Sequence, residues 1–262
     1  MIYDIFLATS VTKMLDHNRV AMIVCCCDGT VDGILTAVFD AWAAGVNDSR
    51  ISIGKGNIEW FADYIDIVTD SAKASRVAAK VIAVMGYDAY EMIYFAAVSG
   101  ADDRGDAIFK FIRKGLQVGC GIVNDLHDKY VMRVFELHRA SQREYQHIRG
   151  FLRFRDCKGY LIARIEPKNN ICEILMQFFE DRLKQERFII IDVVRGLAGV
   201  HDSNASYMTY IEDDMLAIIR DKEITDEFGK LWKVFEDNIA IKSRYNPGLQ
   251  RQNLPNRFRK YM

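Results

Sequence analysis

The chain has no long hydrophobic run and none of several short motifs that mark common enzymes. No apolar stretch approaches the roughly 20 residues of a membrane-spanning helix, and the first residues lack the basic start of a signal peptide. A His-Glu-x-x-His pair, a Walker-type phosphate loop and a nucleophile elbow are absent as well. We therefore expect a cytoplasmic protein with no membrane segment. Because these motifs are absent, the sequence does not indicate any of the enzyme classes that they mark.

Metal-ligand spacings are also missing. The six cysteines form no Cys-x-x-Cys pair, and the five histidines are not spaced as metal ligands. The adjacent residues Cys25, Cys26 and Cys27 cannot all reach one metal from a strand, because alternate side chains leave opposite faces. We expect no metal and no cofactor, and interpret the cysteines as buried thiols of a reducing compartment.

Acidic residues are missing from the last part of the chain. The whole sequence has 35 Lys and Arg against 36 Asp and Glu, yet no acidic residue lies between Ile239 and Met262. Arg244, Arg251 and Arg257 alternate there with amide, aromatic and apolar residues. One interpretation is an ordered, docked tail (238–262) that presents cations to phosphates and aromatic faces to bases. The other is a basic helix and turn that balances an acidic body.

Hydrophobic periodicity predicts strands near both ends and helices in the middle. Strands are expected at Arg19–Cys27, Tyr64–Val68 (within 60–68), Phe151–Arg155, Tyr160–Ile165, Arg187–Arg195, Gly196–Val200 and Ser206–Ile211. Helices are expected from Thr30 to Gly45 and at Ser71–Met85, Asp88–Val98, Asp102–Lys114, Asn124–His147, Asn170–Lys184 and Thr225–Lys242. No repeat or linker divides the chain. We therefore predict an α+β fold: one compact domain over 1–262 with a helical middle, mixed strands from both ends and a basic C-terminal segment.

Two carboxylates, Asp28 and Asp32, lie where the first strand turns into a helix. Such a pair could bind a divalent metal or polarise a water molecule. Asp is also an ordinary turn and cap residue that the helix dipole favours. We expect the structural role for both.

Basic residues gather in a second place, at His147, Arg149, Arg153 and Arg155. On a strand, Arg153 and Arg155 share one face and Phe154 takes the other. Two arginines on one exposed face suit consecutive phosphates, although such a face also suits pairing with surface acids. Further along, Asp192 and Arg195 point to opposite strand faces and pair directly only if the strand ends by Val193. Asp192 then either caps a neighbouring turn, which we favour, or belongs to an active site.

Four segments together resemble one bacterial family. They begin Asp28-Gly-Thr-Val-Asp-Gly, His147-Ile-Arg-Gly-Phe, Phe188-Ile-Ile-Ile-Asp and Ile241-Lys-Ser-Arg-Tyr-Asn-Pro-Gly, and they span nearly the whole chain. The sequence resembles the "probable DNA metabolism" or putative DNA repair family, typically encoded beside a radical-SAM protein and related to a domain fused to uracil-DNA-glycosylase-like proteins. The resemblance implies a role in DNA repair or modification with that partner. This chain lacks the three-cysteine pattern of a radical-SAM cluster, so any radical chemistry belongs to the partner.

Three functions remain open from the sequence. The first is a DNA-binding accessory protein that contacts nucleic acid through His147, Arg149, Arg153, Arg155, Arg195, Arg244, Arg251 and Arg257. The second is a DNA-processing enzyme, a nuclease or a glycosylase-like activity built on Asp28, Asp32 and Asp192. The third is a protein-interaction module that makes no contact with DNA. Convergence of the three aspartates in one cleft would favour the enzyme, and a continuous cationic groove would favour the binder.

Overall fold

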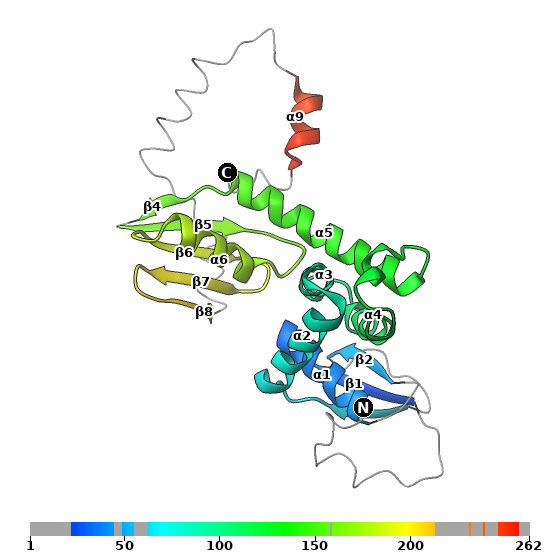
Figure 1. The fold of residues 1–262 in the computed structure, drawn as a ribbon. Helices are drawn as coiled ribbons and strands as arrows, with labels where there is room; N and C mark the ends of the chain where they lie inside the picture. The colour runs from blue at the N-terminus through cyan, green and yellow to red at the C-terminus, as the bar shows by residue number, and fades with distance from the viewer. Residues whose placement is uncertain are drawn as a thin grey trace. The chain divides into compact units, whose positions relative to one another are not determined.

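The computed structural model describes residues 22–44, 49–54, 62–157, 159–212 and 246–256, together with Leu231 and Asn238 (Figure 1). The chain divides into two compact units, Met1–Ser141 and Gln142–Met262. The first contains β1 (Met22–Cys27), α1 (Val31–Ala43), β2 (Arg50–Ile53), β3 (Ala62–Asp66), α2 (Ser71–Met85), α3 (Tyr87–Ala97), α4 (Arg104–Val118) and the 3-10 helix η1 (Cys120–Asn124). Helix α5 (Lys129–Phe151) carries the boundary between the units.

A parallel sheet of order β2-β1-β3 lies at the start of the first unit. Its central strand is the apolar run that the sequence predicts, and Ile23 to Cys27 are all buried. Thr30 caps α1, because its side chain accepts a hydrogen bond from the Gly33 amide. Helix α1 then connects β1 to β2, as a parallel pair requires. Strand β2 was missed, because four residues give too short a pattern.

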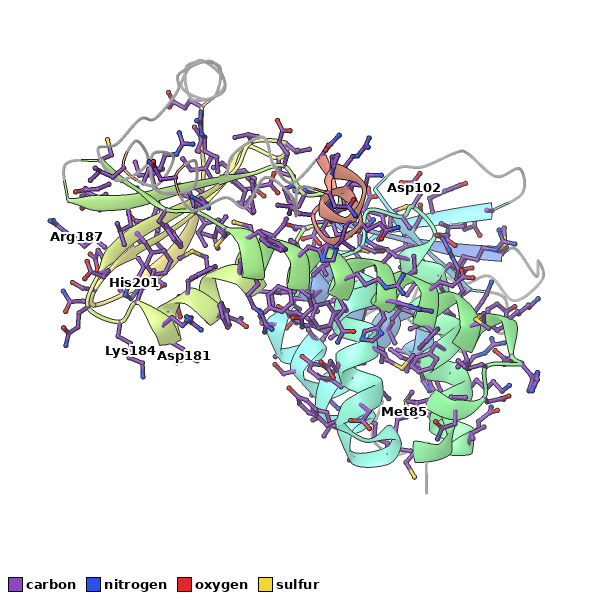
Figure 2. The ribbon with its side chains drawn as sticks, turned by 90° about the horizontal axis from the view of Figure 1, so that it is seen from above. Met85, Asp102, Asp181, Lys184, Arg187 and His201 are labelled. Atoms are coloured by element: carbon purple, nitrogen blue, oxygen red, sulfur yellow. The ribbon has the colours of Figure 1, made fainter. Side chains whose placement is uncertain are left out.

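Helices α2, α3 and α4 contribute to the core of the first unit. Ile93, Ile108 and Phe111 are completely buried there. Two glycines of α4 permit close packing. A side chain at Gly105 would lie 2.9 Å from Ile51 of β2, and one at Gly115 would collide with Met85, which is labelled in Figure 2. All three helices lie within a few residues of the ranges predicted for them.

The second unit is built on a five-stranded sheet of order β4-β5-β6-β7-β8. Its elements are β4 (Arg155–Cys157), β5 (Tyr160–Ile165), α6 (Cys172–Arg182), β6 (Arg187–Asp192), β7 (Leu197–Asp202), β8 (Ser206–Tyr210) and α9 (Pro247–Asn253). Only β5 and β6 are parallel, and α6 connects them. Helix α6 lies on one face of the sheet, where a side chain at Gly199 would collide with Met176 (Figure 1).

Two strand predictions in this unit are wrong in extent. The run from Phe151 to Arg155 is not a strand, because α5 continues to Phe151 and the Leu152 amide donates to the Ile148 carbonyl at 2.7 Å. Strand β4 begins only at Arg155. Strand β6 stops at Asp192, where a turn begins. The predicted helix at Thr225–Lys242 lies outside the described residues except Leu231 and Asn238, which are both helical.

The chain therefore has an α+β fold, as the sequence predicts. The strands of the two ends form separate sheets and do not share one. The single domain over 1–262 stays a prediction. No helix in the described part of the chain is long and apolar enough to cross a membrane. Four of the six cysteines, Cys25, Cys26, Cys27 and Cys172, are buried thiols as expected, whereas Cys120 and Cys157 are exposed.

Candidate functional site

Asp28 lies at the carboxyl end of β1, and its carboxylate closes the turn into α1. Oδ1 accepts hydrogen bonds from the Thr30 amide at 2.9 Å and the Thr30 hydroxyl at 2.7 Å. Oδ2 accepts one from the Thr69 hydroxyl at 2.8 Å. Thr69 follows β3, so Asp28 ties the ends of two neighbouring strands together. Asp32 is exposed in the first turn of α1.

The surroundings of Asp28 favour its ionised form. Partial burial acts to raise its pKa, but the hydrogen bonds from Thr30 and Thr69 outweigh burial and hold the pKa below its ordinary value. Gly33 leaves room for the carboxylate, because any side chain there would collide with Asp28. These contacts are those of a turn-forming carboxylate.

Replacing Asp28 with alanine should lower the free energy of unfolding by about 1 kcal/mol, a typical net contribution of a hydrogen bond to stability. Because the folded-state pKa is depressed, this contribution is present near neutral pH and is lost as the pH falls through the folded pKa. Urea unfolding of wild type and Asp28→Ala at pH 7 and at pH 3 measures it. The difference between the two proteins should shrink at pH 3, and an equal difference at both pH values would contradict the account.

Asp192 is completely buried at the end of β6. Its Oδ1 accepts from the backbone amides of Val194 at 2.9 Å and Arg195 at 3.2 Å, so it caps the turn as we favoured. Oδ2 also forms a salt bridge with Arg195 Nη1 at 2.9 Å. This direct pair forms because the strand ends at Asp192 and the turn brings Arg195 back over it.

Arg195 also forms hydrogen bonds with the loop that follows β5. Its Nη1 donates to the Pro167 carbonyl at 3.1 Å and its Nη2 to the Lys168 carbonyl at 2.6 Å. The carboxyl ends of the parallel strands β5 and β6 are therefore cross-linked through one guanidinium. This use of Arg195 occupies both terminal nitrogens within the protein.

Glu144 of α5 holds the same loop from its amide side, which the sequence reasoning missed. Its side chain is buried and accepts from the Lys168 amide at 3.1 Å, the Asn169 amide at 2.9 Å and Asn169 Nδ2 at 2.7 Å. The loop between β5 and α6 is thus fixed through its carbonyls by Arg195 and through its amides by Glu144. The exposed Lys168 side chain is carried on a firmly held backbone.

Arg149 and Arg182 lie over the same aromatic ring. The guanidinium carbon of Arg149 is 5.3 Å from the Tyr145 ring centre and 4.8 Å from that of Phe178, and the guanidinium carbon of Arg182 is 5.8 Å from that of Phe178. Neither arginine forms a salt bridge with a residue that the structure describes. We call Tyr145, Arg149, Phe178 and Arg182 the arginine–aromatic cluster. Both arginines occupy the last turn of their helices, where the dipole favours cations.

The predicted cationic strand face is wrong in part. Arg153 is exposed but precedes β4, so only Arg155 belongs to the sheet, where it is half-buried and pairs with Ile162 of β5. Phe154 packs inward as the alternation predicts, 5.0 Å from the Phe179 ring centre and 5.7 Å from that of Phe188. His147 is half-buried in α5.

The basic tail is described only at 246–256, so Arg244 and Arg257 lie outside the described residues. Arg251 is exposed in α9, and its Nε donates to the Pro247 carbonyl at 3.1 Å. Leu249 of the same helix is 54% exposed, so this apolar side chain is not buried. The expectation of an ordered, docked tail over 238–262 that presents cations to phosphates stays a prediction.

The predicted acidic residues fall in different units. Asp28 and Asp32 belong to the first unit and Asp192 to the second. Among the described residues, no group of three His, Cys, Asp or Glu side chains is arranged to hold a metal ion. At both Asp28 and Asp192, each carboxylate oxygen already accepts at least one hydrogen bond from the protein's own donors.

Most of the chain matches the model of a known protein family. Residues 102–262, well over half of the chain, match the model of a family described as a domain of unknown function, DUF4130. No curated protein matches the chain. The matched range contains the arginine–aromatic cluster, Glu144, Asp192 and Arg195, and it leaves out Asp28 and Asp32. The chain belongs to the DUF4130 family.

Proposed function

We propose that this protein is a nucleic-acid-binding accessory factor in DNA repair or modification that acts with a radical-SAM partner. The observation that carries the proposal is the pair of arginines, Arg149 and Arg182, held over one ring in the second unit. The partner and the repair context rest on the resemblance to the DNA-metabolism family. The binding chemistry rests on the arginines.

Arginines stacked on aromatic rings are suited to phosphate. Stacking uses the face of the planar guanidinium and leaves the N–H donors at its rim for a ligand. A guanidinium held in this way loses less side-chain entropy when it binds than a freely moving one. Because neither Arg149 nor Arg182 is paired with a described acid, both donor sets suit the oxygens of neighbouring phosphates.

Further cations of the second unit support the same interpretation. Arg187 rests on the Tyr160 ring at 4.7 Å, and its side chain extends away from the sheet (Figure 2). Lys168 is exposed on the loop that Glu144 and Arg195 fix. Three arginines of one unit, the half-buried Arg149 and the exposed Arg182 and Arg187, rest on aromatic rings, which favours a binding surface over isolated ion pairs.

The alternative of a nuclease or glycosylase-like enzyme has less support. Asp192 is completely buried and is occupied by two amides and a guanidinium. Asp28 is occupied by two threonines. A catalytic carboxylate needs a free oxygen directed at a substrate, a water or a metal. The observed contacts favour structural roles for both.

Direct binding tests the proposal. Fluorescence anisotropy of labelled duplex and single-stranded DNA, at low salt, should show saturable binding by the full chain. Affinity purification of the chain from cells that also produce the neighbouring radical-SAM protein should recover that protein. Absence of DNA binding both alone and with the partner would overturn the nucleic-acid proposal. Recovery of the partner without any DNA binding would instead favour the protein-interaction module.

A further inference from the structure

Strand β8 forms one end of the five-stranded sheet. Strand β8 pairs with β7 only, and no strand in the described part of the chain pairs with its outer side (Figure 1). Both of its faces are largely accessible, since Tyr207 is 54% exposed and Tyr210 is 80% exposed. A strand edge of this kind offers a row of backbone donors and acceptors to another strand.

The direction of the backbone groups of β8 follows from its pairing with β7. The Asp202 amide donates to the Ala205 carbonyl at 3.2 Å, and the Ile211 amide donates to the Gly196 carbonyl at 2.7 Å. The backbone groups of the odd-numbered residues of β8 therefore bond to β7, because the direction of backbone hydrogen bonding alternates along an antiparallel strand. The backbone groups of Ser206, Met208 and Tyr210 point outward.

The inner side of β8 is firmly held. The Ser206 hydroxyl lies 2.7 Å from Nδ1 of His201, the residue directly opposite it on β7. The His201 ring is buried against Phe188, with ring centres 4.9 Å apart. This contact fixes the register of β8, so that its outer edge is presented in one conformation.

The two edges of the sheet differ in protection. Strand β4, at the opposite edge, has only three residues, and two of them, Arg155 and Asp156, are charged. Short length and charge are the usual means of preventing edge-to-edge pairing. Strand β8, Ser206-Tyr-Met-Thr-Tyr210, has no charged residue and no proline. The unprotected edge is therefore confined to one side of the sheet.

We propose that β8 is a self-association edge, on which the β8 strand of a second copy pairs antiparallel about a two-fold axis at Met208. In this register Ser206 lies opposite Tyr210 of the second copy, and Met208 lies opposite its own equivalent. Every outward backbone donor and acceptor then meets a partner. A closed two-fold interface is the commonest form of protein self-assembly.

The side chains fit the same register. Tyr207 lies opposite Thr209 of the second copy, so each face gains an aromatic side chain against a small or β-branched one. No like charges oppose one another, because the strand carries none. The edge is thus complementary to itself in the backbone and in the side chains, which favours a second copy as its occupant.

Sedimentation equilibrium over a range of protein concentrations tests the proposal. The wild-type chain of 30.1 kDa should shift with concentration toward twice that mass. The variant Tyr207→Lys/Thr209→Lys places lysines opposite lysines of the second copy and should stay monomeric. The variant Tyr207→Glu/Thr209→Lys places each glutamate opposite a lysine and should recover the dimer.

A control variant and the contradicting results complete the test. Tyr87 is an exposed tyrosine of the first unit, so Tyr87→Lys should leave the mass unchanged from that of wild type. Circular dichroism of each variant confirms that the fold is kept. A wild type that is monomeric at every concentration would overturn the proposal, as would dimerisation of the double-lysine variant to the wild-type extent.

Discussion

Replacing Asp192 with alanine should lower the free energy of unfolding of the second unit by about 3 kcal/mol, the lower end of the range for breaking a buried ion pair. The lower end applies because the Arg195 side chain keeps 26% exposure and can regain some hydration. The variant leaves the amides of Val194 and Arg195 without their acceptor. It also removes the ion partner of the Arg195 guanidinium, which donates hydrogen bonds to the Pro167 and Lys168 carbonyls. Urea unfolding at neutral pH measures the loss.

The variant Asp192→Asn separates the contribution of the turn cap to stability from that of the salt bridge with Arg195. Asparagine keeps an oxygen for the two amides but loses the salt bridge to Arg195, so its loss of stability should be smaller than that of Asp192→Ala. Arg195→Lys keeps a charge but cannot reach Asp192 and both carbonyls with one planar fork, so it should also lose stability. Equal stability of Asp192→Ala and wild type would show that the turn after β6 forms without the contacts of Asp192.

Replacing Glu144 with alanine should destabilise the second unit by about 3 kcal/mol. The change strips an acceptor from the Lys168 amide, the Asn169 amide and the Asn169 side chain, and an unsatisfied buried donor costs about 1–3 kcal/mol. Hydrogen exchange offers a second readout that a general loss of stability would not reproduce. Under native conditions the amides of Lys168 and Asn169 should lose protection far more than those of β6 and β7.

The variant Glu144→Gln is the matched control. It keeps the length of the side chain and one carbonyl oxygen, so it should retain an acceptor for one of the backbone amides and show an intermediate loss. Full protection of Lys168 and Asn169 in Glu144→Ala would show that the loop is held without Glu144. It would also remove the basis for treating Lys168 as a positioned cation.

Much of the fold follows from local patterns in the sequence. The buried run up to Cys27 gives β1, Thr30 begins α1 by capping it, and α2 has the predicted bounds Ser71–Met85. The end of α5 was misjudged because Ile148 and Leu152 continue a helical spacing while Phe151 to Arg155 also alternate as a strand does. A short run that satisfies both periods is decided by tertiary packing, here by Phe154 against Phe179 and Phe188.

The site was less predictable because its contacts join distant segments. Glu144 lies on the buried stripe of α5 formed by Leu137, Ser141 and Ile148, and a carboxylate on such a stripe is a signal that a partner exists. The sequence does not say that this partner is a loop 24 and 25 residues away. From the sequence, Arg149 is a candidate nucleic-acid-binding residue only because of its charge. Its stacking on Phe178 depends on the packing of α6 against α5 within the second unit, which no local pattern encodes.

A salt titration of DNA binding tests most directly the claim that Arg149 and Arg182 contact the phosphate backbone. Wild type is compared with Arg149→Ala/Arg182→Ala and with Arg76→Ala/Lys129→Ala, a control that removes two cations resting on the rings of Phe39 and Tyr130 in the first unit. Each phosphate contact contributes about 0.9 to the slope of log affinity against log salt for duplex DNA. The Arg149/Arg182 variant should therefore bind more weakly with a slope reduced by about 1.8, while the control keeps the wild-type slope. Equal slopes for all three proteins would contradict the account.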